Sequence, residues 1–363
     1  MKDSLFPTFI SMNLSVKYLS ILFRVAILFG IAAIPLPNFA QVDIEVKFKS
    51  SNDTIELAGT LTKPEGSISS IAVLLPVAGP TDRDLTLGIH KYYKTLADSL
   101  ANEGIASLRF DDRGVGDSEG VFMDASLAHR TGDACAALEY LTKQFPEVTR
   151  RGFIGMSEGA GISVLASNQC KSTDFVVLLS MPVRKGVKEM KDQMSRLLAA
   201  SPYPDSVKQR VTTEADKFLK LVSDSKPEQN RDSILAVLKG PYGPVILPAY
   251  QFVPRTPEGR TDFVLSNWYQ SQLNYELSSA LKVLNVPAMA LYGELDKAID
   301  YQSNADVLIK SSPYVKVEVL PGLNHLMQKA NTGWAMEYAM LPTSFSADVI
   351  SRIAEWISEL PKE

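Results

Sequence analysis

Residues 153–161 read FIGMSEGAG, and this stretch decides the fold of the chain. It places Ser157 between Gly155 and Gly159, after a short predicted strand (149–154) and before a predicted helix (160–166). A chain that turns sharply from a strand into a helix is strained, so small residues must flank the bend. The helix also directs its N-terminus at the serine, where developing negative charge is favoured. The pattern predicts a nucleophile elbow that presents Ser157 for attack, and an ordinary strand-to-helix turn is the alternative.

Strands and helices alternate on both sides of this bend. The predicted strands are short and apolar or alternating, and they comprise 42–48, 55–61, 71–75, 105–110, 149–154, 175–180, 288–292 and 315–320. The principal predicted helices lie between them or close the chain, at 92–101, 125–144, 301–311 and 344–360. Such alternation predicts an α/β fold, a mostly parallel central sheet flanked by helices, with chemistry at the carboxyl ends of the strands.

The alternation stops between residues 184 and 284, where no clear buried strand is found. This region carries charged helical stretches and a passage rich in proline and aromatic residues, so we expect a largely helical cap inserted into the core. The predicted organisation is a signal peptide (1–40), a first core part (41–183), the cap (184–284) and a second core part (285–363). Aromatic cap residues are expected mainly in the cap's own core, with a substrate pocket as the alternative: Tyr242, Tyr250, Phe252, Trp268 and Tyr269.

The N-terminus has the order of a secretory signal. Lys17 and Arg24 precede an apolar run (25–34), which is followed by the breakers Pro35 and Pro37 and a small residue, Ala40. We therefore expect an exported protein, periplasmic or secreted, with no stable membrane association after signal cleavage. A permanent membrane anchor is the alternative.

Composition excludes several classes of partner. A net charge of −4, with 21% charged and 45% apolar residues, is ordinary for a globular domain and argues against a nucleic-acid-binding surface and against binding to an anionic membrane. The two cysteines, Cys135 and Cys170, fall in predicted helices and are expected to be separate core thiols rather than a disulfide bridge. They lack the spacing of a zinc site, so no metal or other cofactor is expected, and the oligomeric state is open.

A serine nucleophile needs a base to accept its proton, and that base needs an acidic partner. The chain has three histidines. His90 and His129 are interpreted as solvated surface residues. His325 follows a predicted strand in a glycine-containing loop downstream of the serine, so we expect it to be the base.

The predicted acid is Asp296, in the loop that leaves the preceding strand. Asp300 and Glu294 are its rivals; Asp300 is better placed to cap the next helix. The oxyanion of a tetrahedral intermediate needs backbone N–H donors, which we expect from Glu158, directly after the serine, and from Ala78 in the loop after residues 71–75. Val77 is the alternative to Ala78.

Four stretches together resemble secreted bacterial carboxylesterases of the α/β-hydrolase superfamily, in its serine-aminopeptidase-like branch. They read AGPTDRD (78–84), FDDRGVGDS (110–118), GMSEG (155–159) and LPGLNHL (320–326), the last extending through Thr332 and Gly333. The resemblance spans the predicted mature chain. It implies the α/β-hydrolase fold with a cap between the sixth and seventh strands, and a triad of Ser157, Asp296 and His325.

The chain departs from the pattern at two positions. Met156 replaces a frequent histidine beside the nucleophile, and Val77 replaces a frequent glycine before the oxyanion residue. A β-branched residue restricts the backbone there, so Val77 bears on the oxyanion loop. The segment Asp112-Arg113-Gly114 is interpreted as an ion-paired structural turn under the site.

The sequence therefore predicts a carboxylesterase-type serine hydrolase that cleaves small-molecule esters, with short acyl chains, through an acyl-enzyme. One alternative is an aminopeptidase or another amide hydrolase of the same fold. It would need cap acids to hold a substrate ammonium, and the candidates are Glu258, Asp262 and Glu276. The alternative from another class is a ligand-binding protein without catalytic activity.

Overall fold

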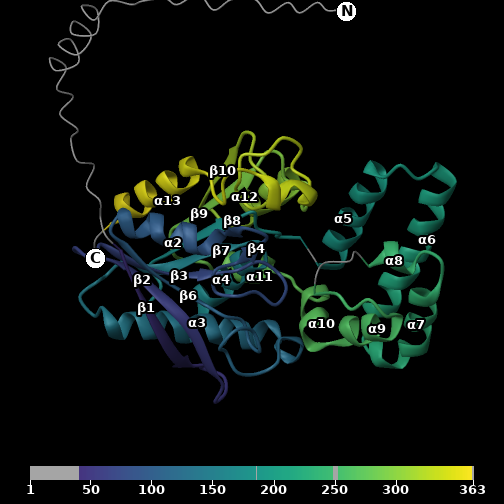
Figure 1. Ribbon diagram of the computed structural model, residues 1–363, viewed down its shortest axis with the longest axis horizontal. Coiled ribbons are helices and arrows are strands. Elements are labelled where there is room, and N and C mark those ends of the chain that lie inside the picture. Colours follow the sequence, from purple (N-terminus) through teal and green to yellow (C-terminus); the bar gives the residue numbers. More distant parts are fainter. Residues whose placement is uncertain (1–40, 185, 248–251, 362–363) are drawn as a thin grey trace, which may run out of the picture. The chain divides into compact units, whose positions relative to one another are not determined.

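The computed structural model describes residues 41–184, 186–247 and 252–361, so the predicted signal peptide lies outside the described residues (Figure 1). The main strands are β1 (Gln41–Lys49), β2 (Glu56–Pro64), β3 (Ser70–Leu75), β6 (Ile105–Phe110), β7 (Arg151–Met156), β8 (Phe175–Leu179), β9 (Ala288–Gly293) and β10 (Val315–Leu320). Two further strands of two residues each form a hairpin that the sequence did not predict: β4 (Thr86–Leu87) and β5 (His90–Lys91).

The helices fall into two groups. Those outside the segment between β8 and α11, together with α11 itself, are α2 (Tyr92–Asn102), η1 (Phe122–Asp124), α3 (Leu127–Gln144), α4 (Glu158–Gln169), α11 (Ser278–Lys282), α12 (Tyr301–Ser311), η3 (Ala335–Met340) and α13 (Ala347–Glu359). Those between β8 and α11 are α5 (Gly186–Ala200), α6 (Asp205–Val222), η2 (Pro227–Asn230), α7 (Arg231–Lys239), α8 (Gly243–Ile246), α9 (Pro257–Leu265) and α10 (Asn267–Leu273).

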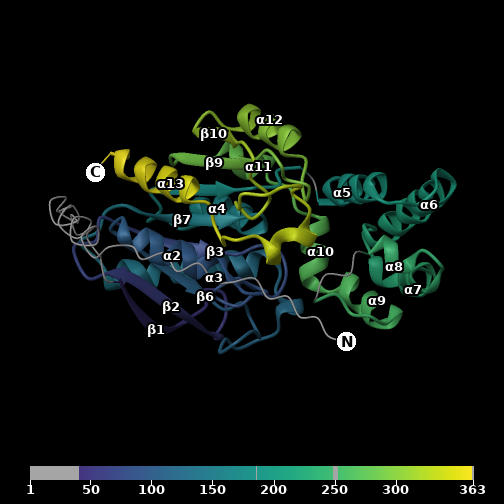
Figure 2. The ribbon, with the colours of Figure 1, turned by 45° about the horizontal axis from the view of Figure 1, so that its top comes forward.

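One eight-stranded sheet organises the structure, in the order β1-β2-β6-β3-β7-β8-β9-β10 (Figures 1 and 2). Strand β2 pairs antiparallel with β1 and with β6, and all other neighbours in this order are parallel. Each predicted strand has a counterpart in the sheet. The mostly parallel arrangement is the predicted one, and it sends the loops after β3, β7, β9 and β10 to the same edge.

Hydrophobic packing explains why the central strands are apolar throughout. Along β3, Ile71 and Val73 belong to the cluster on one face of the sheet, and Ala72 and Leu74 belong to the cluster on the other. Helices α3, α4 and α12 contribute to the first cluster and α2 and α13 to the second, so both faces are covered. The last helix presents one apolar stripe to the second cluster, in which Val349, Ile353 and Ile357 are fully buried.

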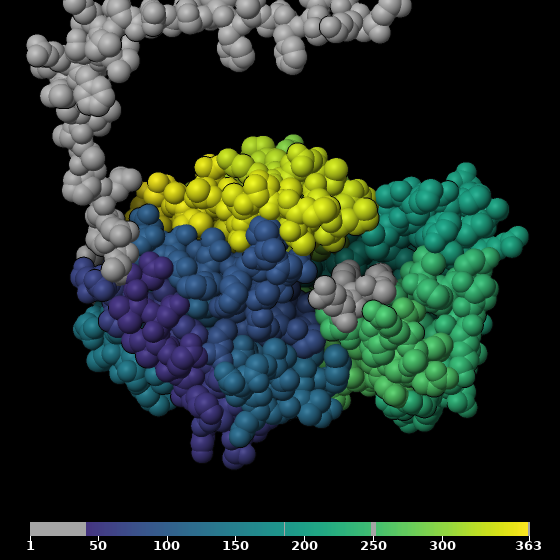
Figure 3. Space-filling view, viewed as in Figure 1, coloured from purple at the N-terminus to yellow at the C-terminus, as the bar shows by residue number. Residues whose placement is uncertain are grey.

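The edge strand β1, purple in Figure 3, alternates as its sequence predicts only in its second half. Val46 and Phe48 are buried and Lys47 between them is exposed, whereas Ile44, which the pattern places on the buried face, is 38% exposed. Charged side chains such as Lys47 and Lys49 on an exposed edge discourage pairing with a strand from another molecule.

Helices between β8 and α11 have a hydrophobic core of their own. Phe218, Ile234, Val264 and Trp268 belong to a third cluster formed mainly by α5 to α10. The last part of the predicted insertion, by contrast, packs on the first cluster through residues such as Leu277. The division of the chain at 184 and 284 stays a prediction. We call helices α5 to α10 the cap.

Within the described residues, no helix combines the length and the apolar character that crossing a membrane requires.

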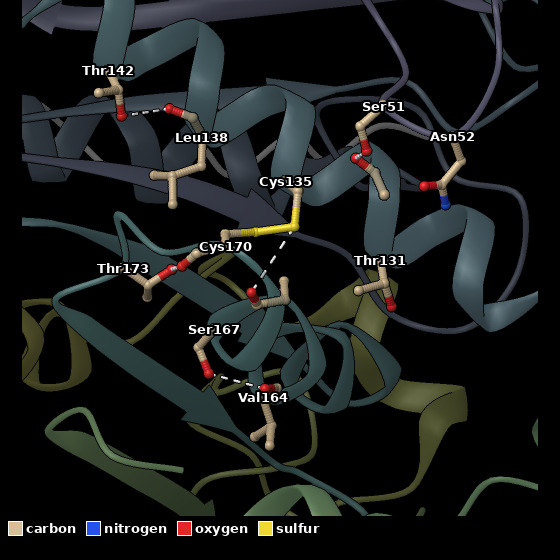
Figure 4. The surroundings of a disulfide bond; sticks show 12 residues. Ser51, Asn52, Thr131, Cys135, Leu138, Thr142, Val164, Ser167, Cys170 and Thr173 are labelled. Atoms are coloured by element: carbon tan, nitrogen blue, oxygen red, sulfur yellow. Dashed lines mark hydrogen bonds between the residues drawn. A yellow bond between two sulfur atoms is a disulfide. The ribbon is translucent and has the colours of Figure 1, made fainter. Parts of the chain in front are cut away.

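The expectation of two separate core thiols was wrong. Cys135 on α3 and Cys170 at the end of α4 form a disulfide bond, with a Cα–Cα distance of 5.7 Å (Figure 4). Both are partly buried rather than enclosed in the core. Cys135 lies in a helix as predicted, and Cys170 is the residue directly after α4. Their pairing could be identified only from the packing of α3 against α4, which sequence periodicity does not reveal.

Removing this bridge is expected to destabilise the protein without abolishing its fold. The disulfide joins residues 35 positions apart. Closing a loop of that length restricts the unfolded chain and contributes about 4 kcal/mol to the free energy of unfolding in the chain-entropy model. The double variant C135S/C170S should therefore melt roughly 6 °C lower in scanning calorimetry. Wild-type protein should shift likewise in reductant, whereas the double variant should not respond; equal melting temperatures in all four conditions would contradict the prediction.

Candidate active site

Ser157 lies at a sharp bend between β7 and α4. Its backbone has φ 54° and ψ −117°, a conformation that a non-glycine residue rarely adopts. Strain of this kind costs on the order of 1–3 kcal/mol and persists only where the surroundings enforce it. One such restraint is the hydrogen bond from the Ser157 N–H to the carbonyl of Leu179 on β8, at 2.8 Å. The strand–turn–helix context predicted for Ser157 is therefore present.

The two flanking glycines are required by close backbone approach. A Cβ atom on Gly155 would lie 2.2 Å from the carbonyl oxygen of Gly159, and a Cβ on Gly159 would lie 2.1 Å from that of Leu75. Neither neighbour is a flexible side chain that could move aside. The glycines thus allow β3, β7 and the first turn of α4 to meet at the serine.

His325 and Asp296 are in direct contact. The distance between His325 Nδ1 and Asp296 Oδ2 is 2.7 Å, and the two side chains are 9% and 0% exposed. Asp296 follows β9 and His325 follows β10, so both lie at the sheet edge that carries Ser157. A carboxylate on Nδ1 fixes the imidazole tautomer, which leaves Nε2 as the nitrogen that can accept a proton.

Backbone hydrogen bonds hold this pair in place. The other oxygen of Asp296, Oδ1, accepts hydrogen bonds from the N–H groups of Ala298 and Ile299, at 2.8 and 3.0 Å. Beside His325, the buried Asn324 accepts from the N–H groups of Leu326 and Gln328, both at 3.0 Å. Because both loops are fixed by their own bonds, the pair is preorganised.

The rival acids have other partners. Asp300 caps α12, where Oδ1 accepts the Ser303 N–H at 3.2 Å, as the sequence suggested. Glu294 is exposed and accepts the Gly322 N–H at 3.3 Å. Of the three carboxylates, the structure brings Asp296 to His325.

The interpretation of His90 as a solvated residue was wrong. His90 is only 4% exposed, and its Nδ1 lies 2.9 Å from the hydroxyl of Ser344. The unpredicted β4–β5 hairpin folds it against the C-terminal segment. His129 is half-buried, and its Nδ1 accepts the N–H of Ser126 as part of a capping box on α3.

The loop after β3 contacts the cap. Ala78, the expected oxyanion residue, packs against the cap cluster, whereas Val77 packs against the second core cluster. Gly79 has φ +104°, and a Cβ there would lie 2.5 Å from the ring of Phe252. Glu158 begins α4, whose first N–H groups have no acceptor within the helix. Glu158 is next to Ser157 in the chain, and the carbonyl oxygens of Leu75 and Pro76 at the start of the Ala78 loop approach Gly159. The assignment of the Glu158 and Ala78 N–H groups as oxyanion donors stays a prediction.

Cap aromatic residues form a packed cluster, as expected. Rings of Phe252, Phe263, Trp268 and Tyr269 lie 5.3–6.2 Å apart between centroids, and Phe122 of η1 lies 5.2 Å from Trp268. Tyr242 is partly buried against the same cluster, and Tyr250 lies outside the described residues.

Three candidate acids for a substrate ammonium lie at the surface. Glu258 pairs with Lys239 at 2.8 Å, and Asp262 pairs with Arg231; both acids are more than half exposed. Glu276 is also exposed and caps the N–H of Ser278 at 2.9 Å. These are the solvated carboxylates of an ordinary protein surface.

The expected ion-paired turn is confirmed: Arg113 contacts Asp133 at 2.7 Å and Asp53 at 2.6 Å.

Sequence reasoning missed two residues near the serine. Arg130 forms an ion pair with Glu158, and Gln272 of the cap donates a hydrogen bond to the same carboxylate. The one available signal was an arginine on the face of a predicted helix that also carries Ala134 and Leu138. Across the described part of the chain, no group of three or more potential ligands is arranged to hold a metal ion.

Comparisons with known proteins agree on the fold. Residues 89–231 match the model of the family described as serine aminopeptidase, S33. Esterase EstD of Thermotoga maritima is 25% identical over 328 residues, which cover 89% of this chain and 70% of that protein. The Pyrococcus furiosus esterase Pf2001 (TM-score 0.54, 16% identity) covers 89% of this chain and 92% of its own. Proline iminopeptidase of Mycobacterium smegmatis (TM-score 0.52, 13% identity) covers 87% and 98%.

The protein has the α/β-hydrolase fold, as predicted. At these identities the solved structures show the fold alone. The family match and the similarity to esterase EstD together support a carboxylesterase-type hydrolase.

Proposed function

We propose that this protein is an exported serine esterase that hydrolyses small carboxylic esters with short acyl chains through an acyl-enzyme. In this proposal Ser157 is the nucleophile, His325 the general base, and Asp296 the group that orients and stabilises the imidazole. The observation that carries it is the 2.7 Å contact between His325 Nδ1 and Asp296 Oδ2, at the sheet edge where the strained bend presents Ser157.

Acylation begins when His325 Nε2 accepts the proton of the Ser157 hydroxyl, whose oxygen attacks the ester carbonyl. The tetrahedral intermediate collapses as the imidazolium returns that proton to the departing alcohol oxygen. Asp296 remains ionised throughout, since its role is to stabilise the imidazolium. Asp296 suits this role because it is buried and because two backbone N–H groups donate to its Oδ1, which holds the carboxylate in place.

Deacylation repeats the sequence with water. His325 accepts a proton from the water molecule that attacks the acyl-enzyme, and then donates it to Ser157 as the acid product leaves. In both halves, the oxyanion is stabilised by the backbone N–H groups of Glu158 and Ala78. The positive end of α4 adds to this stabilisation.

Ester hydrolysis is favoured over aminopeptidase activity by the surroundings of the cap acids. A buried ammonium would need an unpaired or desolvated carboxylate near the site, whereas Glu258 and Asp262 are exposed and already paired with cations. The family description keeps amide hydrolysis as the second candidate.

A direct comparison of substrates separates these candidates. Purified protein should hydrolyse p-nitrophenyl butyrate with a kcat/KM at least about 100-fold above that for aminoacyl-p-nitroanilides, because the three candidate cap acids are solvated at the surface, where they would bind a substrate ammonium weakly. A preference for the anilides would replace the proposal by an aminopeptidase. Failure to hydrolyse either substrate, with no labelling by a fluorophosphonate, would favour a binding protein without catalytic activity.

Export is supported by two independent features. The first 40 residues have the order of a secretory signal, and Cys135 and Cys170 form a disulfide of the kind that persists in oxidising compartments. Fractionation of the native host should find the protein outside the cytoplasm, shortened near residue 40. A full-length protein retained in the cytoplasm would contradict this part of the proposal.

A further inference from the structure

Arg130 lies between two carboxylates from different elements, Glu158 at the start of α4 and Asp112 in the loop after β6. It belongs to α3, is 5% exposed, and directs Nη1 to Glu158 Oε2 at 2.5 Å. Its Nη2 lies 3.4 Å from Asp112 Oδ1. A planar guanidinium can contact two carboxylates on separate sides in a fixed geometry, which a lysine ammonium cannot do.

Each carboxylate is connected to one of the two expected oxyanion donors. Glu158 supplies one donor from its own backbone. Asp112 holds the loop that supplies the other, because its Oδ2 accepts from the N–H and the hydroxyl of Thr81, at 2.9 and 2.7 Å. The Asp112 N–H in turn donates to the carbonyl of Thr81 at 3.1 Å. Thr81 lies three residues after Ala78.

The electrostatics of this group depend on Arg130. Both acids are almost completely buried, at 3% exposed for Glu158 and 5% for Asp112. Burial raises the pKa of each carboxyl, and the charge of Arg130 opposes that shift in both. With the guanidinium in place, a cation faces both buried carboxylates, and they accept hydrogen bonds from Thr81 and Gln272 respectively.

We propose that Arg130 is a positioning residue that sets the separation between the backbone N–H groups of Glu158 and Ala78. It acts through the two carboxylates and does not touch the substrate. The inference rests on the proposed esterase function. Oxyanion donors work only when they are aimed within a fraction of an ångström at the developing charge. Displacing the N–H group of Glu158 or Ala78 should therefore lower kcat more than it weakens substrate binding.

The test compares Arg130→Lys with Arg113→Lys as a matched control. Arg113 is also 5% exposed and also contacts two carboxylates, but its ion-pair partners among the described residues are Asp133 and Asp53. Both variants lose a buried planar guanidinium, so both should melt at lower temperature. Only Arg130→Lys should lose kcat on p-nitrophenyl butyrate, by about 100-fold with KM changed less than about threefold.

A second readout isolates the oxyanion. The affinity of Arg130→Lys for an alkyl boronic acid, which mimics the tetrahedral intermediate, should fall by the same factor as kcat/KM, while butyrate binds as in wild type. If Arg130→Lys does not fold, Thr81→Val removes one of the bonds to Asp112 from a half-buried position. That variant should lower kcat about fivefold at constant KM.

Either variant can overturn the inference. Arg130→Lys with wild-type kcat, or with the same loss as Arg113→Lys, would show that the ion pairs serve stability alone. If Arg130→Lys does not fold, wild-type kinetics in Thr81→Val would likewise contradict the positioning role of Arg130. Wild-type protein in the same assay separates this result from the broader proposal: if it does not hydrolyse the ester, the esterase function fails, and the role of Arg130 falls with it.

Discussion

Ser157→Ala is expected to lower kcat on p-nitrophenyl butyrate by roughly 10⁶-fold, the loss seen when the nucleophile of a serine hydrolase is removed. Alanine retains the backbone of the bend but leaves no oxygen to attack the carbonyl. A residual rate somewhat above that in water should remain, because the oxyanion donors and binding contacts are unchanged. Stopped and steady-state assays of p-nitrophenol release measure the effect.

Ser167→Ala is the control for this variant. Ser167 lies on α4, the helix that begins after Ser157, and the variant loses a comparable hydroxyl, which donates a 2.9 Å hydrogen bond to the carbonyl of Val164. Its kcat should equal that of wild type. Circular dichroism should show both variants folded. Turnover of Ser157→Ala at the wild-type rate would remove the serine from the mechanism.

Asp296→Asn should lower kcat by roughly 10⁴-fold, the second largest effect. An amide at this position donates through its nitrogen or accepts through its oxygen, but it carries no charge to stabilise the imidazolium. It also permits the wrong tautomer of His325, with the proton on Nε2. The pH–rate profile and kcat should both change, whereas KM should change little because Asp296 is buried behind the histidine.

The rival acids supply matched controls. Asp300→Asn retains a helix cap, since asparagine also caps well, and Glu294→Gln alters an exposed side chain. Both should keep wild-type kcat. If Glu294→Gln or Asp300→Asn lost activity while Asp296→Asn kept it, the assignment of the acid would have to move.

Local sequence was sufficient for the elements that position the site. The FIGMSEGAG stretch predicts a strand, a bend and a helix because glycines on both sides of Ser157 allow backbone segments to pack closely. In the structure, a Cβ on Gly155 or Gly159 would clash with neighbouring backbone atoms. Likewise, Asp296 and His325 could be chosen by position, since each follows an apolar strand and parallel strands bring their carboxyl ends to one edge. Their contact in the structure follows from this topology.

What the sequence could not supply depends on contacts between distant segments. The disulfide requires knowing that α3 and α4 lie side by side, and the burial of His90 requires a hairpin too short to leave a periodic pattern. Arg130 is informative only once Glu158 and Asp112, 28 and 18 residues away along the chain, are known to meet it. A charged residue on a helix otherwise predicts a solvated face.

The central claim is that an ester acylates Ser157. Intact-mass analysis after treatment with a fluorophosphonate, followed by peptide mapping, tests it most directly. The account predicts a single adduct on Ser157, lost in Ser157→Ala and formed much more slowly in Asp296→Asn. A protein that hydrolyses the ester yet carries no adduct, or carries it on another residue, would contradict the account.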